Sequence, residues 1–174
     1  ATAVLMQRFD ARRYIRAIEQ QRCTWLTSVP AMIAMVVREA EELRRADLSS
    51  VRLVRMGSSP VSSKLIEQVR QIFGGASITN HYGTTEGGPL VFGASADGRK
   101  LPDGAAGWPL PGVAVRLLSP DGREEAEQGE LVYWTPATMK RYVKLPEMTR
   151  QVLTPDGWYR TGDLFRRDAH GAYW

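Results

Sequence analysis

The residues best equipped for chemistry lie between positions 80 and 88, which read NHYGTTEGG and follow a short apolar run. Glycines allow a sharp turn and let a ligand approach the backbone closely. Hydroxyl and carboxylate oxygens suit a phosphate group and a divalent cation, and a tyrosine ring offers a flat face to a base. The same composition is equally typical of a glycine-rich surface loop, so the rest of the chain has to distinguish the two interpretations.

Three further stretches place polar residues beside glycine, namely GSSP at 57–60, GELVYW at 129–134 and GWYRTGDL at 157–164. Each has an ordinary structural explanation when taken alone, because Ser and Pro commonly begin helices and because Gly and Asp favour tight turns. For the side chain of His81, packing or hydrogen bonding is the favoured interpretation. The order of these stretches along the chain therefore carries more information than any one of them.

The first half of the chain alternates between helical and strand patterns. Helices are expected over residues 11–21, from Pro30 onward and over 64–73, and strands over 23–29, 51–57 and 76–79. Asp10 is expected to cap the first helix, and Ser62 or Ser63 the third, because short polar side chains satisfy the free N–H groups at a helix start. The apolar residues recur at helical spacing in each helix and give it one buried face.

Strands that alternate with helices indicate a parallel sheet with crossover helices, and therefore an α/β fold class. In such sheets, ligands bind beyond the carboxyl ends of the strands. The stretch 57–60 follows the second expected strand, and 80–88 follows the third. We therefore expect these two stretches to lie side by side on one rim of the sheet.

The pattern changes near residue 92, where glycine and proline become frequent. Short alternating segments over 113–119, 129–134 and 158–168 then predict strands, which are separated by Pro-Asp-Gly turns. These features indicate a smaller, antiparallel, β-barrel-like lobe. We expect a partial α/β subdomain over 1–91, which carries the candidate site stretches 57–60 and 80–88, and a partial β-rich subdomain over 92–174.

Composition narrows the classes of function. Of the 174 residues, 43% are hydrophobic and 24% charged, which is typical of a globular protein. The net charge of +4 is spread along the chain, which suits an anionic small ligand and argues against a nucleic-acid partner. One cysteine and two histidines exclude an internal disulfide, a Cys-based metal site and a multi-His centre. No apolar run is long enough for a membrane span, and we expect a reducing, cytoplasmic location.

In order, GSSP, YGTTE, GEL, PEMT, GWYRTGD and a final Tyr-Trp segment resemble the adenylate-forming superfamily of acyl-CoA synthetases, firefly-type luciferases and adenylation domains. The resemblance extends over essentially the whole chain, and its most specific feature is the pair YGTTE and YRTGD with GEL between them. It implies that a carboxylate attacks the α-phosphate of ATP and releases pyrophosphate. A thiol, usually that of coenzyme A, then displaces AMP.

The resemblance also implies roles for single residues. Glu86 would bind Mg²⁺ and Thr85 would donate to the α-phosphate, so these two are the candidate catalytic residues. Tyr82 would stack on adenine, and Asp163 would accept both ribose hydroxyls, since the two oxygens of a carboxylate suit a vicinal diol. The residues expected to bind ATP or AMP are Gly57, Ser58, Ser59, Pro60, Asn80, His81, Tyr82, Gly83, Thr84, Thr85 and Asp163.

Some family features differ or are missing. Ser58 and Ser59 stand where the family usually has Gly and Ala, and Arg141 stands where it often has Gly. Neither the phosphate-binding loop nor the C-terminal adenylation lysine of the family has a counterpart. We therefore expect an internal fragment of the large N-terminal domain, inactive alone, whose uncovered surfaces could let two copies associate.

The leading hypothesis is a fragment of an AMP-forming acyl-CoA synthetase that uses a carboxylic acid, ATP with Mg²⁺, and coenzyme A. A fragment of a carrier-protein-loading adenylation domain and a non-catalytic nucleotide-binding module are the alternatives. Leu90, Val91 and Phe92 indicate an apolar acid, for which a fatty acid and an aromatic acid both remain open.

Overall fold

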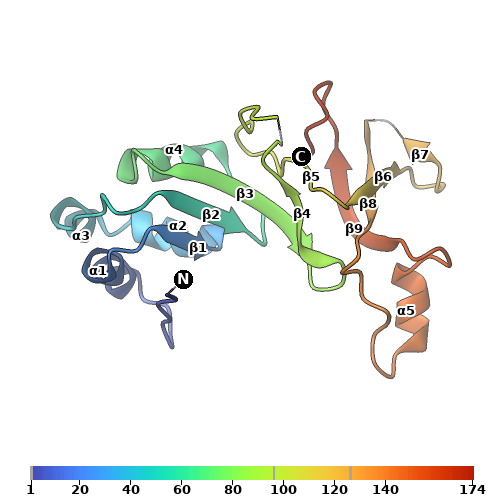
Figure 1. The fold of residues 1–174 in the computed structure, drawn as a ribbon, viewed down its shortest axis with the longest axis horizontal. Coiled ribbons are helices and arrows are strands. Elements are labelled where there is room, and N and C mark those ends of the chain that lie inside the picture. Colours follow the sequence, from blue (N-terminus) through green and yellow to red (C-terminus); the bar gives the residue numbers. More distant parts are fainter. Residues whose placement is uncertain (1, 96, 126) are drawn as a thin grey trace. The chain divides into compact units, whose positions relative to one another are not determined.

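The computed structural model describes residues 2–95, 97–125 and 127–174, and the chain divides into two compact units (Figure 1). Unit 1 is Ala1–Asn80 and unit 2 is His81–Trp174. Each unit contains hydrophobic core of its own. The contacts group residues 81–91 with the second half of the chain, whereas the sequence pattern had placed them in the first subdomain.

Unit 1 contains the helices α1 (Ala11–Gln21), α2 (Pro30–Val37), α3 (Ala40–Arg45) and α4 (Ser63–Ile72). The expected caps are confirmed. An Asp10 carboxylate oxygen accepts from the backbone N–H of Arg13 at 2.8 Å, and the Ser62 hydroxyl accepts from that of Leu65 at 3.2 Å. The single helix expected from Pro30 onward is instead two short helices, α2 and α3.

The strands of unit 1 form the expected parallel pair. β1 (Trp25–Ser28) lies beside β2 (Leu53–Gly57), with Trp25 opposite Leu53. Alternate residues of both strands are buried and share a core with α2 and α4. The central residues of this core are Leu26, Ile33, Val54, Met56, Ile66 and Val69. The period of two in a strand therefore produces one buried face, as expected from the sequence.

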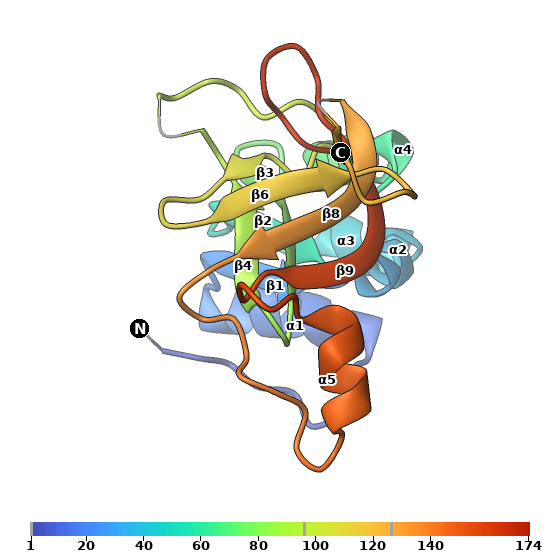
Figure 2. The same cartoon turned by 90° about the vertical axis from the view of Figure 1, so that its right-hand side faces the viewer.

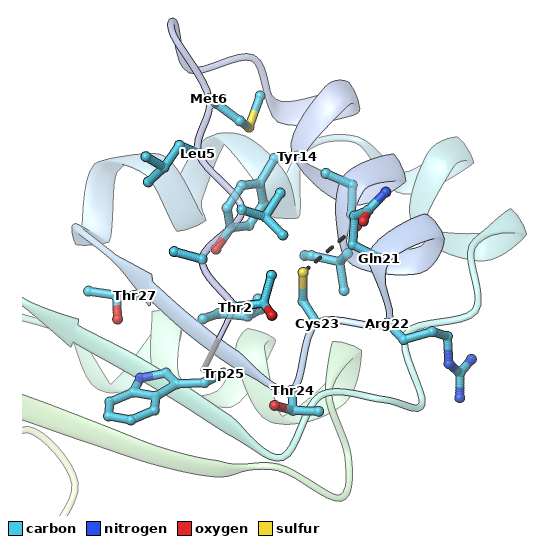
Figure 3. A pocket seen from close by; sticks show the side chains of 15 residues that line it. Thr2, Leu5, Met6, Tyr14, Gln21, Arg22, Cys23, Thr24, Trp25 and Thr27 are labelled. Carbon is cyan, nitrogen blue, oxygen red and sulfur yellow. Dashed lines mark hydrogen bonds between the residues drawn. The ribbon is translucent and has the colours of Figure 1, made fainter.

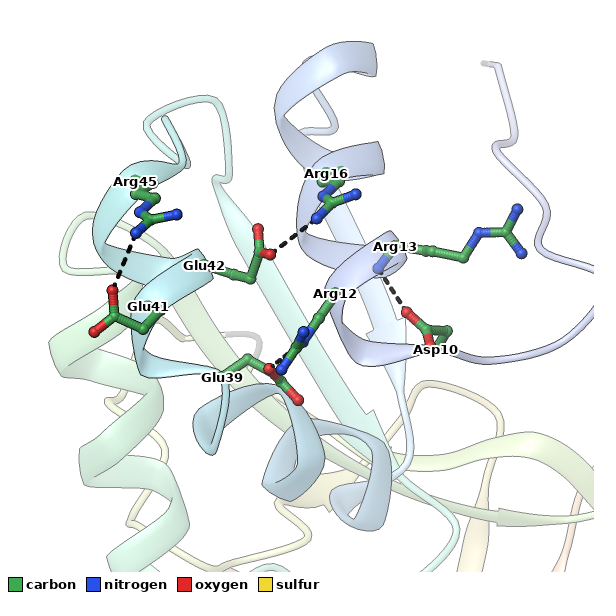
Figure 4. A network of polar contacts seen from close by, with 8 residues as sticks. All are labelled: Asp10, Arg12, Arg13, Arg16, Glu39, Glu41, Glu42 and Arg45. Carbon is green, nitrogen blue, oxygen red and sulfur yellow. Dashed lines mark hydrogen bonds and ion pairs between the residues drawn. The ribbon is translucent and has the colours of Figure 1, made fainter.

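Ion pairs link the surfaces of α1 and α3 (Figure 4). Arg12 contacts Glu39 at 2.7 Å, and Arg16 contacts Glu42 at 2.9 Å. Both arginine side chains are more than half exposed, so solvent screens each pair and each is expected to add little to stability. Arg12 and Arg16 therefore have a structural role and need no anionic ligand to account for their charge.

β3 (Ser77–Thr84) begins in unit 1 and ends in unit 2, where it pairs antiparallel with β4 (Gly88–Gly93). The prediction that all of 80–88 lies in a loop is wrong, because 80–84 continue the strand and only the short segment before Gly88 turns. Tyr and Thr favour strands. Gly83 permits the close pairing, since a Cβ there would lie 2.3 Å from the backbone carbon of Pro89.

Unit 2 contains a sheet with the strand order β7-β6-β8-β9, and Figure 2 shows β6, β8 and β9 of this sheet. Its strands are β6 (Ala114–Leu118), β7 (Glu124–Glu125), β8 (Gln128–Trp134) and β9 (Tyr159–Arg166), and the short strand β5 (Trp108–Pro109) pairs with β4. The pairing is antiparallel, as expected. The described strands form an open sheet rather than a closed barrel, so the barrel-like expectation is wrong.

The helix α5 (Pro146–Val152) lies between β8 and β9 in the chain. In the described ranges, no helix combines the length and the apolar character that crossing a membrane would require.

Candidate functional site

The two most specific motifs meet within unit 2. The phenol of Tyr82, on β3, donates a hydrogen bond to Oδ2 of Asp163, on β9. The resemblance implies that 80–88 and 157–164 serve one nucleotide, which requires the two motifs to lie close together, and the hydrogen bond shows this proximity. The stretch 80–88 is therefore more than an independent surface turn. That the two motifs form one nucleotide site stays a prediction.

The ring of Tyr82 packs within the aromatic core of unit 2. It meets Phe165 edge-on, with ring centroids 4.8 Å apart, and lies 6.0 Å from Phe92. Burial, and then the hydrogen bond to Asp163, raise the pKa of Tyr82 well above its ordinary value. The phenol therefore stays protonated and remains a hydrogen-bond donor at physiological pH.

Asp163 is presented by an irregular part of β9. The register between β8 and β9 shifts at this point, and Gly162 has a φ of +74°, in the left-handed region that favours glycine. The backbone N–H of Asp163 donates to the Thr161 hydroxyl at 2.9 Å. This local turn leaves the Asp163 side chain exposed.

Glu86 lies in the turn between β3 and β4 and is held by a residue from another element. The phenol of Tyr142 donates to Oε1 of Glu86 at 2.7 Å, and the backbone N–H of Met139 donates to the Glu86 carbonyl at 2.6 Å. The hydrogen bond from Tyr142 lowers the pKa of Glu86 and raises the pKa of Tyr142 to about 12. Glu86 is thus an oriented carboxylate, ionised at neutral pH.

Sequence reasoning missed Tyr142. The segment around it attracted notice only because Arg141 replaces a glycine, and the tyrosine next to it was passed over. The presence of a tyrosine in a loop, with a phenol able to donate a hydrogen bond, could have marked Tyr142 as a candidate.

The hydroxyl of Thr84 has a structural partner on each side. It shares a hydrogen bond of 2.7 Å with the phenol of Tyr133 and accepts from the backbone N–H of Gly87 at 3.0 Å. Burial raises the pKa of Tyr133 to about 12, so this phenol also remains protonated. By contrast, Thr85 is exposed at the tip of the turn. Of the two threonines, Thr85 is therefore better placed to meet a ligand.

The remaining predicted residues are divided between the units. Gly57 ends β2 in unit 1, and Ser58, Ser59 and Pro60 follow it and are exposed. Asn80 ends unit 1, while His81 and Gly83 are half-buried residues of β3 in unit 2. That all of them line one pocket stays a prediction.

The three residues expected to face an apolar substrate belong mostly to the core. Val91 and Phe92 are fully buried in the aromatic cluster of unit 2, and only Leu90 is partly exposed. The first two therefore stabilise the fold, and the expectation that they contact a substrate tail is wrong.

A metal ion would find few ligands on this chain. Among the described residues, no three His, Cys, Asp or Glu side chains gather into a metal-binding group. A Mg²⁺ ion is commonly bound by one or two carboxylates together with phosphate oxygens of a substrate. The single carboxylate of Glu86 fits such a shared site, in which the nucleotide supplies the other oxygens.

A separate hollow of about 670 Å³ lies in unit 1 between the N-terminal segment, α1 and β1 (Figure 3). Tyr14, Cys23 and Trp25 are among its lining residues. The Tyr14 phenol pairs with the Ser28 hydroxyl at 2.8 Å, and the Cys23 thiol contacts the Ala17 carbonyl at 3.8 Å. None of the predicted site residues lines this hollow.

Comparison with known proteins points to one family. Residues 1–143 match the family model described as AMP-binding enzyme. The chain is 34% identical over 176 residues to indoleacetate–CoA ligase of Aromatoleum aromaticum. The alignment covers 100% of this chain and 34% of that protein. It is also 34% identical over 175 residues to 4-coumarate–CoA ligase-like 6 of Oryza sativa subsp. japonica. This alignment covers 97% of this chain and 29% of that protein.

A similar fold is found in the amide bond synthetase McbA of Marinactinospora thermotolerans. The two structures align with a TM-score of 0.81 and 30% identity, over 97% of this chain and 34% of that one. The chain spans about a third of the length of the proteins it matches.

Proposed function

The chain belongs to the family of AMP-binding enzymes, and from this premise we propose that it forms the nucleotide-binding part of an AMP-forming acyl-CoA synthetase. The observation that carries the proposal is the hydrogen bond between Tyr82 and Asp163, because it joins the two motifs within unit 2. By family the enzyme is an acid–thiol ligase. The roles of single residues given below are proposals.

Asp163 is proposed to bind the ribose. Its Oδ2 atom accepts from Tyr82, but each oxygen of a carboxylate offers about two acceptor positions, so hydroxyl groups of a sugar can still be bound. Tyr82 is half-buried beside this carboxylate, and an adenine base is proposed to stack on its ring. Asn80 and His81 would supply backbone groups to the base.

Glu86 and Thr85 are proposed to act on the phosphates. Thr85 would donate its exposed hydroxyl to the α-phosphate, and Glu86 would hold Mg²⁺ with a carboxylate that Tyr142 orients. When bound, this ion supplies positive charge where negative charge develops at the α-phosphate. For Gly57, Ser58, Ser59 and Pro60, which belong to unit 1, contact with the adenine and acyl groups is a proposal from the family resemblance.

Coenzyme A is the proposed acceptor, because both relatives above are named as CoA ligases. Transfer to an amine is the second candidate, since the similar structure is that of an amide bond synthetase. The names of the two relatives refer to indoleacetate and 4-coumarate, so an aromatic carboxylic acid is the proposed substrate class. The enzyme would act in the cytoplasm, where ATP and coenzyme A are available.

The proposal predicts that AMP binds at Asp163. We expect Asp163→Ala to weaken AMP binding by about tenfold, which corresponds to ~1.4 kcal/mol and is reasonable for a hydrogen bond to a charged group. Dissociation constants would be measured by ligand-observed NMR titration of the chain and its variants. Asp121→Ala is the matched control, because Asp121 is an exposed aspartate in the turn between β6 and β7.

Equal AMP binding by the Asp163→Ala and Asp121→Ala variants would contradict the assigned role of Asp163. A wild-type chain that does not bind AMP even at millimolar concentration would contradict the proposal that this chain forms the nucleotide site.

A further inference from the structure

We propose that Glu130 is a positioning residue for Asp163, because it holds the turn of β9 that presents this carboxylate to the ribose of a nucleotide. The inference rests on the proposed function and concerns a residue that itself touches neither nucleotide nor acyl group.

The need for such a residue comes from the register of β8 and β9. Val132 lies opposite Arg160, whereas Glu130 lies opposite Leu164, so a longer segment of β9 faces a shorter segment of β8. Three residues of β9, Thr161 to Asp163, stand opposite the single residue Leu131, and this segment departs from the regular ladder. Residues of a bulge lose strand partners and need other hydrogen bonds to fix their position.

Glu130 supplies these hydrogen bonds. Its Oε1 atom accepts from the backbone N–H of Gly162 at 3.2 Å, inside the bulge. Its Oε2 atom accepts from Nη2 of Arg160 at 2.5 Å, and Nε of Arg160 lies 3.3 Å from Oε1. One carboxylate therefore ties down two residues that flank Thr161 in the sequence.

The pair is better shielded than most ion pairs on this chain. The Glu130 side chain is 19% exposed, while that of Arg160 is 48% exposed. A two-pronged contact between a guanidinium and a carboxylate is both stronger and more directional than a contact with a lysine. Glu130 also raises the pKa of Arg160, which keeps this cation charged.

Two further hydrogen bonds carry this constraint to Asp163. The Thr161 hydroxyl donates to the Leu131 carbonyl at 2.7 Å and accepts from the backbone N–H of Asp163 at 2.9 Å. The Asp163 side chain is then met by Tyr82 from β3. The carboxylate is thus fixed through its backbone from β8 and through its side chain from β3.

The test compares two ligands that differ only in the groups that Asp163 is proposed to bind. AMP has both ribose hydroxyls, whereas 2′,3′-dideoxy-AMP has neither. We expect Glu130→Ala to raise the dissociation constant of AMP by about tenfold and to leave that of 2′,3′-dideoxy-AMP unchanged, since the base and phosphate contacts remain. A loss limited to AMP is not expected from a side chain that only stabilises the fold, because general destabilisation would affect both ligands.

Glu124→Ala is the matched control, because Glu124 also pairs with an arginine, Arg116, at 3.8 Å, but lies on β7, which pairs with β6. It should change neither constant. Arg160→Lys is the milder variant if Glu130→Ala fails to fold, and it should weaken AMP binding by a smaller factor of roughly threefold, since lysine cannot form the two-pronged contact. Amide hydrogen exchange gives a readout without ligand, in which the Gly162 amide should exchange faster in Glu130→Ala.

An equal loss for both ligands, or no loss for AMP, would overturn the inference while leaving the proposed function intact. An unchanged exchange rate of the Gly162 amide would also overturn it. A wild-type chain that binds neither ligand would overturn the proposed function itself, and the inference with it.

Discussion

Tyr82 and Tyr142 each donate a phenol hydrogen bond to an acidic side chain, Asp163 and Glu86 respectively. In both pairs the partner lies on a different element, and in both the carboxylate is the residue proposed to meet the nucleotide or its metal ion. A hydrogen bond to one oxygen limits rotation of a carboxylate and leaves it further capacity to accept. Single residues of this site are therefore oriented by neighbours that need not contact the ligand.

Ser58 offers a prediction at the same scale. Its φ of +68° lies in the left-handed region, which costs a residue other than glycine roughly 1–2 kcal/mol. Ser58→Gly removes this strain, but glycine also gives the unfolded chain more freedom, which costs about 0.4–1 kcal/mol. We expect a net gain in the free energy of unfolding of up to about 1 kcal/mol, measured by urea denaturation.

Ser59→Gly is the matched control for this change, since Ser59 is an exposed neighbour without a positive φ. It should lose stability, because only the entropic cost applies. A gain of the same size in both variants would show that backbone strain at Ser58 is not the cause.

At the scale of elements, the β3–β4 hairpin determines where Thr85 and Glu86 lie. Its turn receives hydrogen bonds from three residues of the connection between β8 and α5. The Thr135 hydroxyl donates to the Gly87 carbonyl at 2.8 Å, and the Met139 amide and Tyr142 phenol bind Glu86. The hairpin is therefore fixed from outside as well as by its own strand pairing.

The hairpin yields a prediction about Gly87. A Cβ at this position would lie 2.2 Å from ring atoms of Tyr133, which is fully buried and cannot easily move. We expect Gly87→Ala to lower the free energy of unfolding by about 1–3 kcal/mol, as overpacking of a core commonly does. Urea denaturation, with tyrosine and tryptophan fluorescence as the signal, would measure the loss.

Gly75→Ala serves as the comparison, because a Cβ there has no neighbour within 4 Å and the residue has no positive φ. This variant should be neutral or slightly more stable. Similar losses in both variants would contradict the clash with Tyr133.

The sequence predicted where helices and strands begin better than which distant strands and side chains contact one another. Asp10, Pro30 and Ser62 mark helix starts through interactions within a few residues, and those starts are confirmed. Sheet closure depends on whether distant edges pair, which alternation within a strand does not reveal, so a barrel was expected where the described sheet is open. Tyr142 was missed for the same reason, since its partner Glu86 lies 56 positions away.

The meeting of Tyr82 with Asp163 was also long-range, but the order of the motifs predicted it correctly. The nucleotide-binding roles of these residues came from resemblance to a family rather than from the residues alone. They remain proposals, as does the expectation that two copies of the chain associate.

At the scale of the whole molecule, the chain corresponds to about a third of each relative. The first half of the proposed reaction needs protein groups that contact the pyrophosphate and the attacking acid, and positioned groups of this kind contribute several kcal/mol to catalysis. We propose that these 174 residues bind nucleotide without completing the reaction.

We therefore predict that the isolated chain gives only background ATP–pyrophosphate exchange with 4-coumarate or indoleacetate as the acid. Detection of labelled ATP after incubation with labelled pyrophosphate is the measurement, and a complete acyl-CoA synthetase is the positive control. Exchange at a rate similar to that control would contradict the proposed division of the reaction between this chain and further residues.

The protected phenol of Tyr82 has a consequence for chemical labelling. Reagents that nitrate or iodinate tyrosine attack the phenolate form, and the raised pKa of Tyr82 makes that form scarce at neutral pH. A nucleotide whose base stacks on Tyr82 would cover the ring further while Asp163 keeps its hydrogen bond to the phenol, so occupancy is expected to slow the modification of Tyr82. The rate at which Tyr82 is modified, followed by peptide mass spectrometry, would then act as a native reporter of occupancy that needs no added fluorophore.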